Sequence, residues 1–244
     1  VAHSSWDTWL DGYVPGAPYR KTSIYDEGNL IAFMLDVQIM KHTNNQKGLS
    51  DVCRELYNEF GKKNNMFIIG HTLVWHNQTP AWFFQDENGK PKSKEAVAER
   101  LHDHIKTVAG RYAGKVDAWD VVNEVIQPSD NTPNKLRNSP WYQFLGENYI
   151  EIAFRAAAEA DPAALLVYNE YDVEFDDTAR TDAILNLLKR LQAKRVPIHA
   201  LGIQAHIRSA DTQKFNANMS AFRKFLNDVA ALGLKIIITE FDCD

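Results

Sequence analysis

The chain has 244 residues, of which 45% are hydrophobic and 24% are charged, and its formal net charge is -5. These values are typical of a soluble globular protein with one large apolar core. The slight acidic excess argues against nucleic acid, which usually binds a basic face. No apolar run reaches the roughly 20 residues that a membrane-spanning helix needs. The pairing of Cys53 and Cys243 cannot be inferred from sequence, and two free thiols are the simplest interpretation.

The first part of the chain shows no regular alternation of elements. Residues 1–30 are rich in glycine, proline and scattered aromatics, a composition typical of a loop. Residues 29–40 form a mixed apolar run that fits either a strand of a β-sandwich or a helix of a barrel. We place a domain boundary near the polar stretch 43–47, which leaves 1–48 as a segment of uncertain fold and 49–244 as a second domain.

From residue 49 onward, helical and strand patterns alternate. Apolar residues at three- and four-residue spacing predict helices over 49–60, 97–112, 150–157, 184–191 and 215–229. Ser93 is expected to cap the second of these helices. The last helix is expected to bury Phe215, Met219, Phe222, Leu226 and Val229.

Apolar runs between these helices predict five strands, at 66–69, 116–124, 165–170, 200–206 and 235–240. Runs of valine and isoleucine are typical of parallel strands that are covered on both faces. Strands that alternate with helices indicate βαβ units, which form a parallel sheet with right-handed crossovers.

Each predicted strand ends in polar side chains. These are His71 and His76, Asn123 and Glu124, Asn169 and Glu170, Gln204 and His206, and Glu240 and Asp242. Active sites of (β/α)8 TIM barrels lie at the carboxyl ends of the strands. Five polar strand ends in succession therefore predict an α/β fold of the (β/α)8 TIM barrel type.

Two of these strand ends carry the acids Glu124 and Glu240. An unpaired buried carboxylate is strongly unfavourable, so acids at these positions are expected to have a task. Two acids in one pocket indicate a glycosidase, which splits a sugar–sugar bond with one acid and one nucleophile or base. Several tryptophans nearby could stack on sugar rings or simply fill the core, and the sequence does not decide between these roles: Trp75, Trp82, Trp119 and Trp141.

The strand ends also carry five motifs in a fixed order. They are Gly-His-Thr-Leu-Val-Trp-His-Asn-Gln at 70–78, Trp-Asp-Val-Val-Asn-Glu at 119–124, Tyr-Asn-Glu-Tyr at 168–171, Gly-Ile-Gln-Ala-His at 202–206 and Ile-Thr-Glu-Phe-Asp at 238–242. With these five motifs the chain resembles the glycoside hydrolase family 10 endo-β-1,4-xylanases. The resemblance covers roughly the central and C-terminal four-fifths of the chain. Agreement in five motifs is very improbable by chance.

The resemblance implies retaining hydrolysis of the β-1,4-xylosidic bonds of xylan. Glu124 would be the general acid/base and Glu240 the nucleophile. Retaining enzymes keep these two carboxyl groups about 5–5.5 Å apart, so that one can attack the anomeric carbon directly. Glu240 has to be ionised, and a donor such as His206 would lower its pKa. Glu124 has to carry a proton at the start.

By the same resemblance, further residues would bind the substrate or support the catalytic pair. His71, Trp75 and Asn123 would line the subsite of the attacked sugar, with Asn123 bonded to the sugar 2-hydroxyl. Gln78 would bind the next sugar on the non-reducing side, and Tyr171 would stack on the leaving-group side. Gln204 and His206 would hold the acid and the nucleophile in place, with Asp242 and His76 as supporting residues.

Two features of the family are missing from the sequence. We find no earlier strand with the Glu-Asn and Lys that contact the non-reducing subsites, and no eighth strand with its tryptophans. Strands 3–7 are clear, so the barrel is expected to be incomplete in this chain. The chain could be part of a longer enzyme, or residues 1–48 could be the tail of an inserted carbohydrate-binding module. A non-catalytic or weakly active xylan-binding relative, or another β-1,4-glycanase such as a cellulase, stays an alternative.

No metal or cofactor is expected, because the sequence has no metal-ligand pattern such as His-Glu-x-x-His. The expected partner is xylan or xylo-oligosaccharides, with no nucleic acid and no membrane. Because xylan is too large to enter a cell intact, we expect a secreted, cell-surface or periplasmic protein, although no signal peptide is visible. The oligomeric state cannot be inferred from the sequence.

Overall fold

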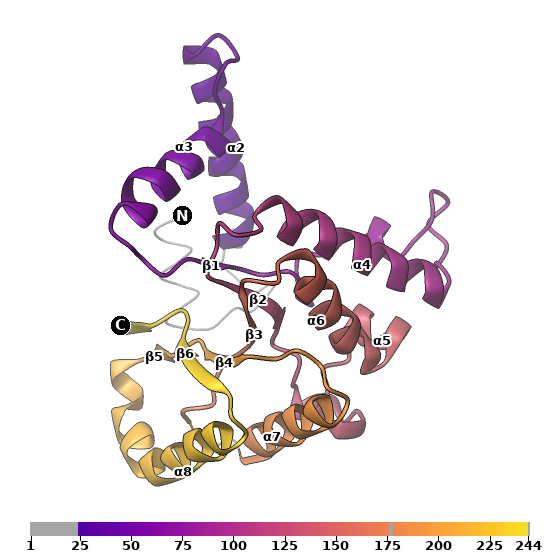
Figure 1. The fold of residues 1–244 in the computed structure, drawn as a ribbon, viewed down its shortest axis with the longest axis vertical. Coiled ribbons are helices and arrows are strands. Elements are labelled where there is room, and N and C mark those ends of the chain that lie inside the picture. The colour runs from indigo at the N-terminus through magenta and orange to yellow at the C-terminus, as the bar shows by residue number, and fades with distance from the viewer. Residues whose placement is uncertain (1–23, 176–177, 244) are drawn as a thin grey trace, which may run out of the picture. The chain divides into compact units, whose positions relative to one another are not determined.

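A computed structural model describes residues 24–175 and 178–243 of the chain (Figure 1). The chain divides into two compact units, Val1–Met66 and Phe67–Asp244. The separate domain predicted for residues 1–48 stays a prediction, because 1–23 lie outside the described residues. Within the described part of the chain, no helix is long and apolar enough to cross a membrane.

The described part of the first unit is helical. It contains α2 (Ile24–His42), α3 (Leu49–Glu55) and the π-helix η1 (Leu56–Lys62). The apolar run at 29–40 is therefore a helix, the strand alternative is wrong, and the loop predicted over 1–30 is wrong for 24–30.

The helix predicted over 49–60 is found as α3 and η1, yet α3 has no buried residue and Phe60 is exposed. The spacing of apolar residues predicts that a segment is helical, but it does not predict whether other parts of the protein cover the apolar side of that helix. Within this unit, Asp36 Oδ1 accepts a hydrogen bond from the Leu49 N–H at 2.6 Å, which joins α2 to the start of α3.

The second unit is built on a parallel sheet of five strands in the order β1-β2-β3-β4-β6. This sheet curls and has helices along it (Figure 1), as expected for part of a (β/α)8 barrel. The strands are β1 (Ile69–Gly70), β2 (Ala118–Asn123), β3 (Leu165–Glu170), β4 (Ala200–Ile203) and β6 (Lys235–Ile238). All five predicted strands are present. A separate parallel pair, β5 (His206–Ile207) and β7 (Asp242–Cys243), follows two of the strand ends.

Helices connect the strands as the alternating pattern predicts. The main ones are α4 (Lys94–Arg111), α6 (Asn148–Ala160), α7 (Thr178–Ala193) and α8 (Thr212–Ala231). Shorter elements were not predicted: η2 (Ala81–Phe83), η3 (Pro128–Asp130), η4 (Pro133–Lys135), α5 (Pro140–Leu145) and η5 (Ser209–Asp211).

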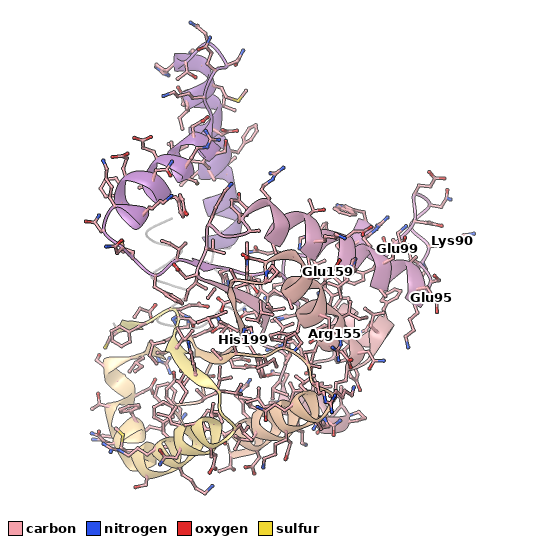
Figure 2. The ribbon with its side chains drawn as sticks, viewed as in Figure 1. Lys90, Glu95, Glu99, Arg155, Glu159 and His199 are labelled. Carbon is pink, nitrogen blue, oxygen red and sulfur yellow. The ribbon has the colours of Figure 1, made fainter. Side chains whose placement is uncertain are left out.

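Helices α4 and α6 lie against each other beside the sheet. Ser93 Oγ accepts from the Ala96 N–H at 3.2 Å, so the predicted cap of α4 is confirmed. Tyr112, the last apolar position of the predicted helix, is 44% exposed and lies one residue beyond the end of α4. On the outer surface, Lys106 Nζ of α4 lies 3.3 Å from Glu159 Oε1 of α6. Glu159 is labelled in Figure 2. Such an exposed ion pair contributes little to stability.

The buried face of α8 differs in part from the predicted one. Its buried residues are Asn218, Phe225 and Val229, whereas Phe215 and Met219 are only partly buried. A polar residue lies in this face because Asn218 Nδ2 donates a hydrogen bond to the Glu174 carbonyl at 2.8 Å. Of the predicted stripe, Val229 is buried, and Phe222 and Leu226 are partly buried against the core, so periodicity placed the C-terminal half of the stripe correctly and missed Asn218.

Strand β6 was predicted to be buried on both faces, and this is wrong. Its residues are partly or fully exposed, and Ile238 is 53% exposed, whereas every residue of β2 is buried. In the described residues β6 pairs only with β4, so it is an edge strand of the sheet.

A glycine in β4 gives a test of the packing beneath the site. A Cβ on Gly202 would lie 2.5 Å from Asn169 Oδ1 and 2.9 Å from Thr239 Cγ2. Overpacking of this kind costs about 1–3 kcal/mol, so Gly202→Ala should lower the free energy of unfolding by that amount in urea titrations.

Gly110 in α4 is the matched control, because a Cβ there meets nothing within 4 Å. Gly110→Ala should stabilise the protein by about 0.5–1 kcal/mol, since alanine is the better helix former. Equal stability of the two variants would contradict the close contact at Gly202.

Candidate active site

The two acids Glu124 and Glu240 belong to one hydrogen-bonded group at the carboxyl ends of the strands. Asn169 Nδ2 donates to Asn123 Oδ1 at 3.0 Å and to Glu240 Oε1 at 2.8 Å. Gln204 Nε2 donates to Asn123 Oδ1 at 3.3 Å and to Glu124 Oε1 at 3.1 Å. Asn123 Nδ2 also donates to Glu124 Oε1, at 3.2 Å. Three side-chain amides therefore connect one carboxyl group to the other.

This amide network follows from the sheet register. Asn123 ends β2 and is paired with Asn169 near the end of β3. Asn169 is in turn paired with Gly202 of β4, whose missing side chain leaves room for the Asn169 amide. Asn169 Oδ1 accepts from the Thr239 hydroxyl at 2.7 Å, so its orientation is fixed. Asn123, Asn169 and Gln204 are all buried.

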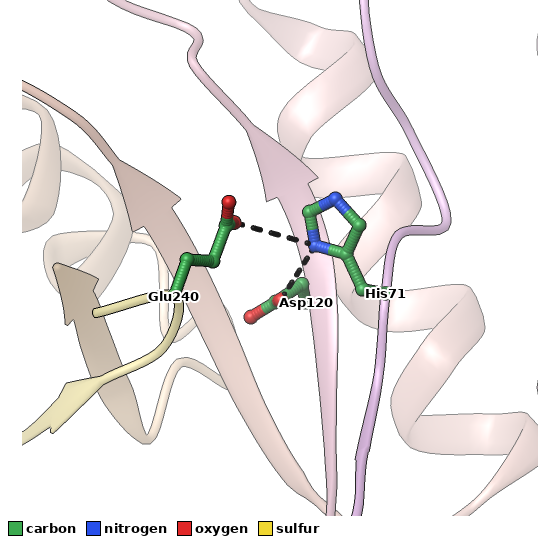
Figure 3. Close-up of side chains that lie close together, drawn as sticks. All are labelled: His71, Asp120 and Glu240. Carbon is green, nitrogen blue, oxygen red and sulfur yellow. Dashed lines mark hydrogen bonds and ion pairs between the residues drawn. The ribbon is translucent and has the colours of Figure 1, made fainter. Parts of the chain in front are cut away.

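Histidines surround Glu240. His206 Nε2 lies 3.3 Å from Glu240 Oε2, and His206 Nδ1 lies 3.0 Å from Asp242 Oδ1. On the other side, His71 Nδ1 lies 2.8 Å from Asp120 Oδ2 and 3.7 Å from Glu240 Oε1 (Figure 3). Asp120 comes from the middle of β2 and is buried. Glu240 is thus flanked by two histidines that each have a second carboxylate partner.

These contacts set the charges around Glu240. The hydrogen bond with Glu240, helped by Asp242 and opposed by burial, raises the pKa of His206 to about 9. The hydrogen bond with Asp120 raises the pKa of His71. Burial by itself raises the pKa of Glu240, but His206, His71 and Asn169 outweigh it and the net shift is downward. Glu240 is therefore held ionised beside a protonated His206 at neutral pH.

Glu124 has different neighbours. His76 Nδ1 lies 3.9 Å from Glu124 Oε2, and burial, together with the charge of Arg137, lowers the pKa of His76 to about 4. Arg137 Nε donates to the Glu124 carbonyl oxygen at 2.7 Å. The carboxyl group of Glu124 therefore faces a neutral imidazole, the amide N–H groups of Asn123 and Gln204, and the Nη2 of Arg137, which lies 3.8 Å from Oε2.

The backbone is in the left-handed region just after β2 and β4 and in the segment that follows β1. Glu124 has φ 56°, Ala205 has φ 59° and Gln78 has φ 60°. Non-glycine residues adopt this region at a cost of about 1–3 kcal/mol, and such strain is concentrated at functional sites. The Glu124 N–H donates to the Asn169 carbonyl at 3.0 Å, which helps to hold this conformation.

Three of the predicted substrate-binding residues belong neither to the amide network nor to the histidines beside Glu240. Trp75 lines a small hollow beside Glu124, and its carbonyl accepts from Trp141 Nε1 at 2.8 Å. Gln78 is exposed, and none of the hydrogen bonds found in the described residues joins its side chain to the catalytic pair. The Tyr171 hydroxyl is hydrogen-bonded to Arg137, Gln127 and Arg180.

Three residues of the site had no role in the sequence analysis. Asn169 was recognised as a strand end but not as the bridge between the two acids. Asp120 is an acid inside an apolar strand, and that position is the signal which could have identified it. Arg137 lies in the loop between η4 and α5, where no periodic pattern marks it.

His71, Asp120 and Glu240 also offer one possible metal ligand each, with the three atoms within 4.8 Å of one another. The distances between these side chains are those of hydrogen bonds and ion pairs, and these contacts explain why the three residues lie close together. The absence of a metal stays a prediction from the sequence.

Comparison with known proteins matches the Glycosyl hydrolase family 10 model over residues 36–244. The chain belongs to this family. The family fold is a (β/α)8 barrel, and the curled sheet corresponds to a part of it.

Relatives within family 10 agree with this assignment. Endo-1,4-beta-xylanase A of Thermotoga neapolitana is 50% identical over 187 residues, which cover 76% of this chain and 17% of that protein. The structure of GH10 from Paenibacillus barcinonensis has a TM-score of 0.70 at 39% identity, with 81% of this chain and 57% of that one covered. Xylanase 10B of Thermotoga petrophila, solved in complex with xylobiose, has a TM-score of 0.66 at 43% identity, with 76% and 52% covered. The chain spans about half the length of these family 10 structures.

The charge arrangement at Glu240 can be tested by NMR titration of the His206 imidazole. Its pKa is raised chiefly by Glu240, so Glu240→Gln should bring the midpoint down from about 9 toward the ordinary value near 6.5. Asp242→Asn, which removes the weaker partner, should lower it less. A wild-type midpoint near 6.5 would contradict this account.

The same shift predicts how stability depends on pH. Because the folded-state pKa of His206 is raised, its stabilising contribution is complete below about pH 6.5 and is lost as the pH rises through about 9. Urea titrations between these pH values should show a smaller decline in Glu240→Gln than in the wild-type chain.

Proposed function

We propose that the protein hydrolyses β-1,4-xylosidic bonds within xylan, with retention of configuration at the anomeric carbon. The observation that carries the proposal is the amide network of Asn123, Asn169 and Gln204, which joins Glu124 and Glu240. Two carboxyl groups in one site, of which one is held ionised, form the arrangement that retaining glycosidases use. Membership of family 10, with relatives named as endo-xylanases, supports the same activity.

In the first step Glu240 attacks the anomeric carbon while the bond from that carbon to the leaving oxygen breaks. Glu124 gives its proton to this oxygen, and a glycosyl ester forms on Glu240. In the second step Glu124 takes a proton from water, the water oxygen attacks the anomeric carbon, and Glu240 leaves as a carboxylate. Protonated His206 and the Asn169 amide stabilise the charge of Glu240 before attack and after release.

The remaining predicted residues are proposed to hold the sugars. His71, Trp75 and Asn123 surround the attacked sugar, and an amide at Asn123 suits a hydrogen bond to its 2-hydroxyl that strengthens in the transition state. Tyr171 is proposed to stack on the leaving-group sugar and Gln78 to bind on the opposite side. Because xylan is a polymer too large to enter a cell, we propose that the protein acts outside the cytoplasm.

Release of reducing sugar from xylan tests this proposal. Glu124→Ala should lower the rate by about 10²–10⁴-fold, the usual contribution of a general acid/base. Glu240→Ala should abolish turnover, since no covalent intermediate can form. Glu159→Ala on the outer surface of α6 is the matched control and should keep the rate.

Two results would contradict the proposal. One is unchanged hydrolysis by the Glu240→Ala variant. The other is a wild-type chain that binds xylo-oligosaccharides but releases no reducing ends. Faster cleavage of cello-oligosaccharides than of xylo-oligosaccharides would replace xylan with a glucan as the substrate.

A further inference from the structure

The chain leaves the sheet directly after β2, at the proposed acid/base. Strand β2 ends at Asn123, and Glu124 has φ 56°, in the left-handed region. The Glu124 N–H donates to the Asn169 carbonyl at 3.0 Å, and Arg137 Nε donates to the Glu124 carbonyl oxygen at 2.7 Å. Two residues further on, Ile126 is fully buried, so its own N–H and carbonyl need partners within the protein.

Glu170 and Arg180 supply both partners of the Ile126 main chain. The Ile126 N–H donates to Glu170 Oε1 at 2.8 Å, and Arg180 Nη1 donates to the Ile126 carbonyl oxygen at 2.8 Å. The two side chains also face each other, with Arg180 Nη1 3.5 Å from Glu170 Oε2. Hydrogen bonds of charged groups are stronger than those between neutral groups. One pair of side chains therefore holds Ile126 firmly at both of its main-chain polar groups.

This pair is itself fixed by its surroundings. The side chain of Glu170 is 0% exposed and that of Arg180 is 6% exposed. Glu170, at the end of β3, also accepts from the Tyr168 hydroxyl at 2.7 Å. Arg180, in the first turn of α7, also donates from Nη2 to Gln127 Oε1 at 3.2 Å and to Tyr171 Oη at 3.3 Å. Side chains from β3 and α7 thus meet at the segment that follows the proposed acid/base.

The hold on Ile126 does not depend on the charge of Glu170. Burial raises the pKa of Glu170 to about 7, although Arg180, the Ile126 N–H and the Tyr168 hydroxyl oppose this shift. Oε1 accepts the hydrogen bonds of Ile126 and Tyr168. This oxygen keeps its capacity as an acceptor when the other carboxyl oxygen carries a proton.

We propose that Glu170 and Arg180 are positioning residues, which hold the main chain at Ile126 and thereby keep the Glu124 carboxyl in place beside the sugar. The inference rests on the proposed function, in which Glu124 protonates the leaving oxygen and later takes a proton from water. A misplacement of about 1 Å can slow a catalytic step on the order of 10²-fold. Loss of the pair should therefore slow the steps that need Glu124 and spare the attack by Glu240.

A dinitrophenyl β-xylobioside separates these steps. Its leaving group departs without a proton, so kcat/KM reports the attack of Glu240 on the anomeric carbon. In the second step Glu124 takes a proton from water, the water oxygen bonds to the anomeric carbon, and the ester bond to Glu240 breaks. When this step is slow, it determines kcat. Azide ion can replace water and needs no base, so its nitrogen bonds to the anomeric carbon and a xylobiosyl azide forms.

The test variant combines Glu170→Leu with Arg180→Met. Apolar residues of similar volume often replace a buried ion pair without loss of stability, so this variant removes the hold on Ile126 and keeps the packing. Its kcat should fall about tenfold or more, while kcat/KM should stay within about threefold of the wild-type value, so that KM falls with kcat. Azide should restore kcat in the variant and leave the wild-type kcat unchanged.

Two more variants complete the comparison. Arg180→Lys keeps the positive charge but not the planar fork that reaches Ile126 and Gln127 together, so it should show the same pattern to a smaller extent. The matched control combines Glu147→Leu with Arg190→Met. It removes another ion pair of α7, in which Arg190 Nη2 lies 2.8 Å from Glu147 Oε2, and it should leave kcat and kcat/KM unchanged.

Hydrogen exchange followed by NMR gives a measurement that needs no turnover. Because Ile126 loses its own partners in the test variant, the informative group is the Glu124 N–H, which is bonded to the Asn169 carbonyl. This N–H should exchange at least about tenfold faster in the test variant than in the wild-type chain, because local opening exposes it. Its exchange should not change in the control variant.

An equal fall of kcat and kcat/KM without rescue by azide would overturn the inference, because it would indicate a general loss of active protein. Unchanged kcat in the folded test variant would overturn it too, as would unchanged exchange of the Glu124 N–H. A wild-type chain that releases no dinitrophenolate would contradict the proposed function instead. The exchange rates would then still decide whether Glu170 and Arg180 hold the main chain at Glu124.

Discussion

The side-chain amide of Asn169 joins the two halves of the site, because its N–H groups donate to acceptors from different strands. One goes to Asn123 at the end of β2 and the other to Glu240 after β6. Neither bond forms unless β3 lies between these strands in its observed register. The parallel sheet therefore determines how the two acids sit relative to each other, and Gly202 provides the space that the amide needs.

Around this bridge, the two carboxyl groups have different neighbours. Glu240 lies beside His206, a cation at neutral pH, and its own pKa is lowered. Glu124 receives hydrogen bonds from neutral amides, while Arg137 donates to its carbonyl oxygen and lies 3.8 Å from its carboxyl oxygen Oε2.

Much of this arrangement could be predicted from the sequence, because apolar runs that end in polar residues mark both the strands and their carboxyl ends. The five strands and the acids at 124 and 240 were found in this way. The bridging role of Asn169 could not be predicted, since it depends on which strands are neighbours. Arg137 acts through a loop without periodicity, and the burial of Asn218 in α8 depends on a backbone carbonyl far away in the sequence.

The central claim is that the network holds Glu124 and Glu240 close enough for direct attack by Glu240 on the sugar. The most direct test is ¹H NMR of the anomeric protons in the first minutes after the protein is mixed with a xylo-oligosaccharide. The account predicts that the β-anomer of the new reducing end forms first and that the α-anomer appears only later, through mutarotation. Initial formation of the α-anomer would indicate attack by water, a wider separation of about 6.5–9.5 Å, and a different role for Glu240.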